Sequence, residues 1–121
     1  MTTQRIVTLA ALFLLALTAL PGQASQPFLR VEYPNGGEVL AAGSRVTVRW
    51  VSLGIDGAVA ILLFREGEQY SVITARAANS GSYSWDLAPD LPAGGRYRLR
   101  ICVLPELRIN DFSDRDFFIK K

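Results

Sequence analysis

Among the side chains of this 121-residue chain, the carboxylates are the best candidates for catalysis or metal binding, and they form two groups. Glu66 and Glu68 lie in one tight turn, while Asp111, Asp114 and Asp116 precede the last apolar segment. A pair of carboxylates can hydrolyse a glycosidic bond, and an Asp-rich stretch can give oxygen ligands to Ca²⁺. Carboxylates in turns are normally solvated, however, and the aspartate group lacks the Gly and the terminal Glu of an EF-hand loop. We therefore expect no catalytic residues, no metal site and no cofactor.

The absence of His and the single Cys further limit the kinds of catalytic and metal sites that this chain could form. The chain contains no His, which excludes Ser-His-Asp hydrolysis, Cys-His catalysis and His-based metal sites. Cys102 is the one cysteine, so an internal disulfide is excluded as well. Alternation places Cys102 on an outward position beside Arg100, whose charge would lower the pKa of the thiol. Its two interpretations are a partly covered residue without a role and a disulfide between two chains.

The first residues indicate the compartment of the protein, and its charge bears on the class of partner. Residues Ile6–Leu20 carry no charge, and 13 of these 15 are apolar. Arg5 precedes this run and Gly22-x-Ala24 follows it, which is the signature of a signal peptide, and the run is shorter than the roughly 20 residues that span a bilayer. We expect a signal peptide at residues 1–24 and one exported domain at residues 25–121, secreted, periplasmic or held in the cell envelope without membrane insertion. Without Arg5 the domain has one more cation than anions, so the basic excess of a nucleic-acid binder is missing and no nucleic-acid partner is expected.

Short alternating segments separated by turn residues fill the exported part, and none has a helical period. They predict seven strands: Phe28–Tyr33, Ser44–Trp50, Ala58–Phe64, Tyr70–Ala75, Ser82–Asp86, Tyr97–Val103 and Asp116–Lys120. Strands of this length with regular turn signals are typical of an all-β, antiparallel β-sandwich of the immunoglobulin-like or fibronectin-III-like kind. Trp50, Trp85 and Tyr97 fall on inward positions and should form the core. Tyr97 is also a candidate for the corner tyrosine of Ig-type folds.

Assigning these strands to sheets gives the candidate binding surface. In the usual order, the first, second, fourth and fifth strands form one sheet, and the third, sixth and seventh form the other. The outer face of the first sheet is then polar. The outer face of the second carries apolar side chains next to arginines, a composition enriched in interfaces. The candidate binding residues on it are Leu62, Phe64, Arg98, Arg100 and Phe118. The alternative is that loops or arginine stems cover this face.

Six ordered segments of the chain carry a resemblance to a known family. They are Leu29-x-Val31-x-x-Pro34-Asn35-Gly36-Gly37-Glu38, Gly43-Ser44…Val48-x-Trp50, Val59-x-Ile61-x-Leu63, Asn79-x-Gly81-x-Tyr83-x-Trp85, Gly95-x-Tyr97-x-Leu99-x-Ile101 and Asp111-x-Ser113…Phe117-x-Ile119. The set resembles the N-terminal domain of yeast cell-wall synthesis proteins of the Kre/Knh type, within the Ser-Thr-rich GPI-anchored membrane protein family. It covers Leu29 to Ile119. Because the sequence ends at Lys120-Lys121 with neither a Ser/Thr-rich tail nor an apolar anchor signal, we expect the single Ig-like module of bacterial secreted proteins.

The resemblance implies no catalytic residues, and it suggests a general role without identifying a ligand. It implies a non-catalytic, secreted or cell-envelope Ig-like module that binds or has a structural part, with an envelope protein or polysaccharide, or a second copy of itself, as the partner. The alternative hypothesis is a carbohydrate-binding module in which Phe64, Phe118 or Tyr70 stacks on sugar rings. If binding survives replacement of Phe64 and Phe118 by Ser, the loops at one end of the sandwich that contain Asp56, Asn79 and Arg108 become the better candidates.

Overall fold

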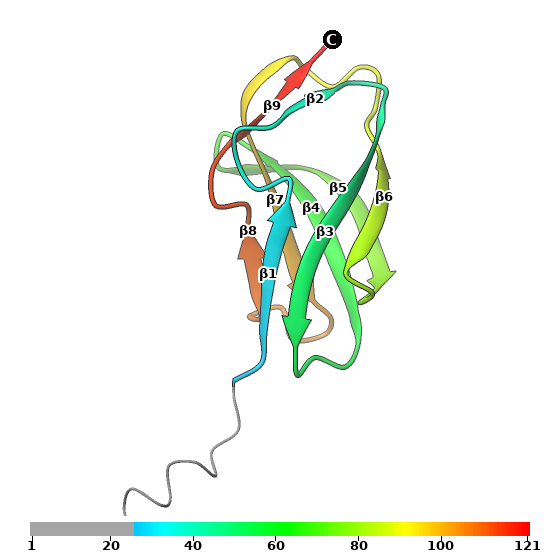
Figure 1. Ribbon diagram of the computed structural model, residues 1–121, viewed down its shortest axis with the longest axis vertical. Helices are drawn as coiled ribbons and strands as arrows, with labels where there is room; N and C mark the ends of the chain where they lie inside the picture. Colours follow the sequence, from blue (N-terminus) through cyan, green and yellow to red (C-terminus); the bar gives the residue numbers. More distant parts are fainter. Residues whose placement is uncertain (1–25) are drawn as a thin grey trace, which may run out of the picture.

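A computed structural model describes residues 26–121, which fold into nine strands and no helix (Figure 1). The strands are β1 (Phe28–Tyr33), β2 (Val39–Ala41), β3 (Arg45–Leu53), β4 (Ala58–Arg65), β5 (Glu68–Ala78), β6 (Ser82–Asp86), β7 (Gly94–Val103), β8 (Asn110–Phe112) and β9 (Phe117–Lys120). The predicted signal peptide, residues 1–24, lies outside the described residues. Within residues 26–121, no helix is long and apolar enough to cross a membrane.

Two sheets face each other, as predicted for an Ig-like sandwich. The smaller sheet has the order β1-β3-β6, and the larger has the order β2-β9-β7-β4-β5, with β8 paired to β7. Figure 1 shows β1, β3 and β6 in front of the larger sheet. All pairs are antiparallel except β2 with β9. All seven predicted strands are present, and the two additional strands, β2 and β8, have three residues each.

The predicted sheet assignment is wrong for the fourth predicted strand. This strand is β5, and it pairs with β4 in the larger sheet instead of joining β6 in the smaller one. The cause is the connection between β4 and β5. Glu66 and Gly67 both have positive φ, 54° and 81°, between the paired residues Arg65 and Glu68. Two consecutive residues of this kind form the tight hairpin turn that keeps successive strands side by side.

The core fills the space between the sheets with the inward residues of alternating strands. Trp50, Trp85 and Tyr97 are 3%, 5% and 0% exposed, which confirms their prediction as core residues. The ring of Phe117 stacks on that of Tyr97, with ring centroids 6.0 Å apart, and meets that of Trp85 edge-on at 6.4 Å. The Tyr97 hydroxyl donates to the Pro92 carbonyl at 2.6 Å, so the predicted corner tyrosine is confirmed.

A buried serine joins the two sheets at the point where the last strand is broken. β8 and β9 both pair with β7, and the chain leaves the ladder between them. Ser113, 1% exposed, lies in this break. Its hydroxyl donates to the Pro34 carbonyl at 2.8 Å and accepts from the Leu99 amide at 3.0 Å. The end of β1 is thereby tied to the middle of β7.

The turn that follows Pro34, here called the Asn35–Glu38 turn, is held by the same break. The Asn35 side chain donates to the Asp114 carboxylate at 3.0 Å and accepts from the Asp114 amide at 2.7 Å. The Glu38 carboxylate accepts from the amides of Asn35 and Gly36 at 2.9 and 2.7 Å. Gly36 has a φ of 146°, and a Cβ there would come within 2.7 Å of the Arg115 Cβ. The turn therefore requires glycine at this position.

Truncating either core tryptophan tests this packing. We expect Trp50→Ala or Trp85→Ala to lower the free energy of unfolding by about 3–5 kcal/mol, as other large aromatic deletions from cores do. Domains of this size have only about 5–15 kcal/mol in total. Urea denaturation followed by circular dichroism measures the loss, with Ser84→Ala on the exposed side of β6 as the control. A tryptophan variant that melts within a few degrees of the wild type would show that its ring is not part of the core.

Candidate functional site

The structure brings four of the five predicted site residues together on the outer face of the larger sheet. Leu62 pairs with Arg100 and Phe64 with Arg98, across β4 and β7. Their side chains alternate with the buried ones of both strands and are half-buried. The fifth residue, Phe118, points to the same face from β9 and is 46% exposed. Its ring lies over Gly95, where a Cβ would approach it to 2.7 Å.

Phe112 on β8 completes this face and was missed by the sequence analysis, which placed it in a loop. It pairs with Arg100, and its ring meets that of Phe64 edge-on, with ring centroids 5.0 Å apart. The Arg100 guanidinium lies over the Phe112 ring, 5.7 Å from its centroid, and donates to the Asn110 side chain at 3.2 Å. We call Phe64, Phe112 and Arg100 the aromatic cluster. β8 has only three residues, too few for an alternating pattern to show in the sequence that Phe112 lies in a strand.

An open pocket of about 620 Å³ lies beside the aromatic cluster, and we call it the outer-face pocket. Phe64 and Phe112 form its apolar wall. Two ion pairs line the rest: Arg98 Nε to Asp116 Oδ1 at 2.8 Å, and Arg96 to Glu66 at 3.3 Å. Charged groups in fixed pairs beside aromatic rings suit recognition of a polar partner with an apolar part.

The carboxylates singled out in the sequence are separated by their partners. Glu66 pairs with Arg96, and its carboxylate is exposed. Asp111 accepts from the amide of Val31 at 2.9 Å, whereas Asp114 and Asp116 are held by Asn35 and Arg98. Among residues 26–121, no group of three or more acidic, His or Cys side chains is placed to hold a metal ion.

Cys102 lies on the outward face beside Arg100, as predicted, but it is buried there and its ionisation differs from the prediction. Cys102 is only 3% exposed, and its cross-strand neighbour Ala60 is also buried, at 8%. Both have short side chains, and the longer Leu62 and Arg100 are the next residues along the same face. Burial raises the pKa of the Cys102 thiol and outweighs the opposite effect of Arg100. The expected lowering of this pKa is therefore wrong, and the buried thiol is poorly placed for a disulfide between chains.

The aromatic residues of the carbohydrate-binding alternative do not form one platform. Tyr70 is exposed, but its ring meets that of the buried Tyr97, with centroids 6.5 Å apart. Phe64 instead meets Phe112 on the outer face. Of the loop candidates, Asn79 accepts from the Trp50 indole at 2.7 Å and Arg108 pairs with Glu106 at 3.0 Å, whereas Asp56 is exposed.

The family model described as the Kre9/KNH-like N-terminal Ig-like domain matches residues 33–115. The chain belongs to this family. The resemblance carried by the six sequence segments is thereby confirmed, and Ig-like modules of this kind are generally non-catalytic. Each segment of the Kre9/KNH-like pattern lies in a strand or in a turn next to one, so the pattern itself describes the fold.

Two solved structures match most of this chain at low sequence identity. The fibronectin(III)-like modules of Clostridium thermocellum CbhA are 14% identical, with a TM-score of 0.48, over 77% of this chain and 96% of that one. The CARDB domain of a Pyrococcus furiosus protein, solved in complex with di-metal ions, is 14% identical, with a TM-score of 0.37, over 78% of this chain and 92% of that one. Among curated proteins, no sequence matches.

The burial of Cys102 predicts low thiol reactivity in the native Kre9/KNH-like domain. Its raised pKa leaves less thiolate at any given pH than an exposed cysteine has, and the thiolate is the reacting species. We expect slow labelling by a thiol reagent at pH 8 and fast labelling in urea. Thr47→Cys adds an exposed thiol and should show one fast and one slow group. Native Cys102 that labels as fast as position 47 would contradict its burial.

Proposed function

We propose that this chain is a non-catalytic binding or structural module of the secreted or cell-envelope proteins. It binds its partner, an envelope protein or polysaccharide, through the outer face of the larger sheet. The observation that carries the proposal is the aromatic cluster, with Phe64, Phe112 and Arg100 in mutual contact on the side of the sheet that faces away from the core.

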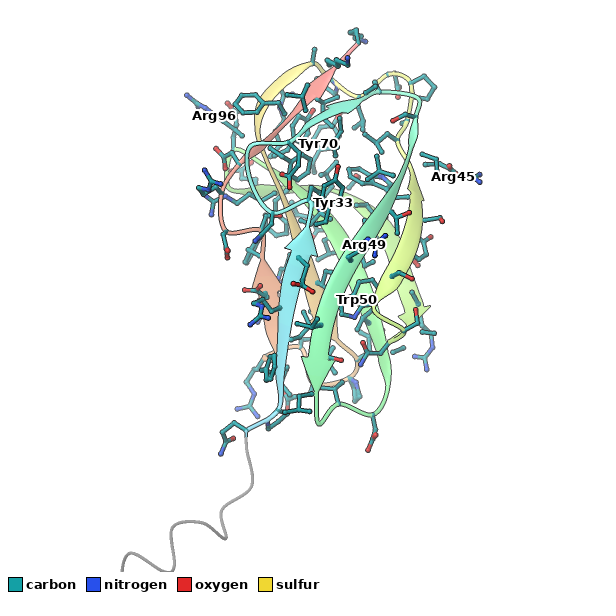
Figure 2. All side chains as sticks on the ribbon, viewed as in Figure 1. Tyr33, Arg45, Arg49, Trp50, Tyr70 and Arg96 are labelled. Carbon is teal, nitrogen blue, oxygen red and sulfur yellow. The ribbon has the colours of Figure 1, made fainter. Side chains whose placement is uncertain are left out.

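The contrast between the two outer faces supports this choice of surface. The outer face of the smaller sheet is largely polar, and Figure 2 shows Arg45 projecting from it, while Arg96 projects from the opposite side of the molecule. The larger sheet instead presents two phenylalanines and a stacked arginine beside the outer-face pocket. Aromatic residues and arginine are the types that most often dominate binding energy at interfaces. The family match to Ig-like modules and the predicted signal peptide support a binding role outside the cytoplasm.

Carbohydrate binding is the second candidate, favoured by the shape and chemistry of the outer-face pocket. Sugar rings have apolar faces that pack on aromatic side chains, and their hydroxyls bond to paired charged groups. The pocket offers the rings of Phe64 and Phe112 next to Arg98–Asp116 and Arg96–Glu66.

Replacing the exposed phenylalanines of this face tests the proposal. We expect Phe112→Ser with Phe118→Ser to stay folded, because these rings are 37% and 46% exposed, and to lose partner binding by at least about tenfold. Phe28→Ser with Leu53→Ser is the matched control, since these two residues are paired and are 41% and 52% exposed on the smaller sheet.

The measurement is binding to a glycan array and to envelope extract treated with either protease or glycosidases. Binding that survives glycosidases and is lost with protease identifies a protein partner, and the reverse identifies a polysaccharide. A double variant that unfolds would show that these phenylalanines belong to the core. A folded variant that binds like the control in both assays would exclude the outer face of the larger sheet as the binding surface.

A further inference from the structure

One sheet edge lacks the features that protect the other edges from pairing. At β1, the Asp111 carboxylate accepts a hydrogen bond from the outward N–H of Val31. β5 changes register against β4 at three points, and β2 has only three residues. β6 pairs with β3 in unbroken register and contains neither Pro nor Lys. Bulges, short strands, covering side chains, Pro and Lys are the usual protection of edge strands, so β6 is the edge best suited to accept another strand.

The hydrogen bonds at the ends of β6 show which of its backbone groups point outward. The Trp50 amide donates to the Gly81 carbonyl at 3.1 Å, and the Leu87 amide to the Ser44 carbonyl at 2.9 Å. Bonds in an antiparallel ladder involve every second residue. Gly81 and Leu87 therefore bond to β3 together with the odd-numbered residues between them, and Ser84 at the centre directs its N–H and C=O away from β3. The same holds for Ser82 and Asp86, of which the Ser82 carbonyl also accepts from the Ser80 hydroxyl at 3.0 Å.

We propose that β6 pairs with β6 of a second copy of this chain, antiparallel, about a twofold axis at Ser84. Each Ser84 then donates to and accepts from the other, and Ser82 pairs with Asp86 of the second copy in the same way. The two smaller sheets become one continuous sheet of six strands. This self-pairing uses a different part of the molecule from the proposed partner surface on the larger sheet.

Side chains on both faces of such a sheet complement one another. On the outer face, Ser82 lies in the ladder between Arg49 of its own chain and Asp86 of the second copy, so the two charged side chains would flank the short serine from either side. Asp86 is exposed and already accepts from Arg45 at 2.7 Å, so charges alternate across the joined sheet. On the inner face, Tyr83 lies opposite Trp85 of the second copy in a position without backbone bonds, where cross-strand side chains come closest. These rings adjoin a pocket of about 370 Å³ between β5 and β6 that Leu63 and Leu91 also line.

Proline at the centre of the edge tests this pairing directly. Ser84→Pro removes the outward N–H without removing a bond to β3, and the pairing loses two such bonds. We expect the dimer dissociation constant to rise about 100-fold, at about tenfold per bond. Ser84→Thr keeps the N–H and should dimerise like the wild type. Analytical ultracentrifugation over a concentration series measures both, and circular dichroism confirms folding.

A charge exchange keeps the test valid if the proline variant fails to fold. Asp86→Arg should weaken the dimer, because it places a like charge across Ser82 from Arg49 of the second copy, and Arg49→Asp in the same chain should restore it. The side chains of the Arg45–Asp86 pair are 70% and 71% exposed, so its loss should leave the fold intact. Phe112→Ser with Phe118→Ser should leave the dimer unchanged, which separates this proposal from the partner surface. Wild-type chain that stays monomeric at about 1 mM, or dimers unaffected by both Ser84→Pro and Asp86→Arg, would overturn the proposal.

Discussion

The arrangement of the two sheets depends on the hydrogen bonds that Ser113 makes between them. Its hydroxyl is buried and satisfied in both directions, by the Pro34 carbonyl and the Leu99 amide. These groups belong to segments far apart in the sequence, one leaving the smaller sheet and one in the middle of the larger sheet. A buried polar group without a partner costs about 1–3 kcal/mol, so this connection favours one relative position of the sheets over others.

The same constraint explains why the family pattern identifies a fold and leaves the ligand open. Asn35, Glu38 and Asp114 satisfy one another and the backbone around the break between β8 and β9. Trp50, Trp85 and Tyr97 fill the core. The side chains proposed to bind a partner lie between these positions in the sequence, on the opposite side of their strands. Different members can therefore keep the same Ig-like fold and carry different surfaces.

Much of the fold could be predicted from single strands, because alternation in β3, β6 and β7 reports which side chains are buried. Relations between strands were harder to predict. The tight turn at Glu66-Gly67 favours pairing of β4 with β5, whereas the usual strand order of Ig-type sandwiches places β5 in the other sheet, and here the turn decides. For the candidate site, Leu62, Phe64, Arg98 and Arg100 could be grouped because β4 and β7 were assigned to one sheet. Phe112 could not, since three residues show no period, and the burial of Cys102 depends on the size of its neighbours on the sheet.

The most direct test of this account is the stability of the Ser113→Ala variant, measured by urea denaturation beside Ser82→Ala, an exposed serine. The substitution removes one hydroxyl and leaves the Pro34 carbonyl and the Leu99 amide without that partner. The account predicts that Ser113→Ala lowers the free energy of unfolding by about 1–3 kcal/mol, whereas Ser82→Ala changes it by less than about 0.5 kcal/mol. Equal stability of the two variants would contradict the claim that this buried serine holds the sheets together.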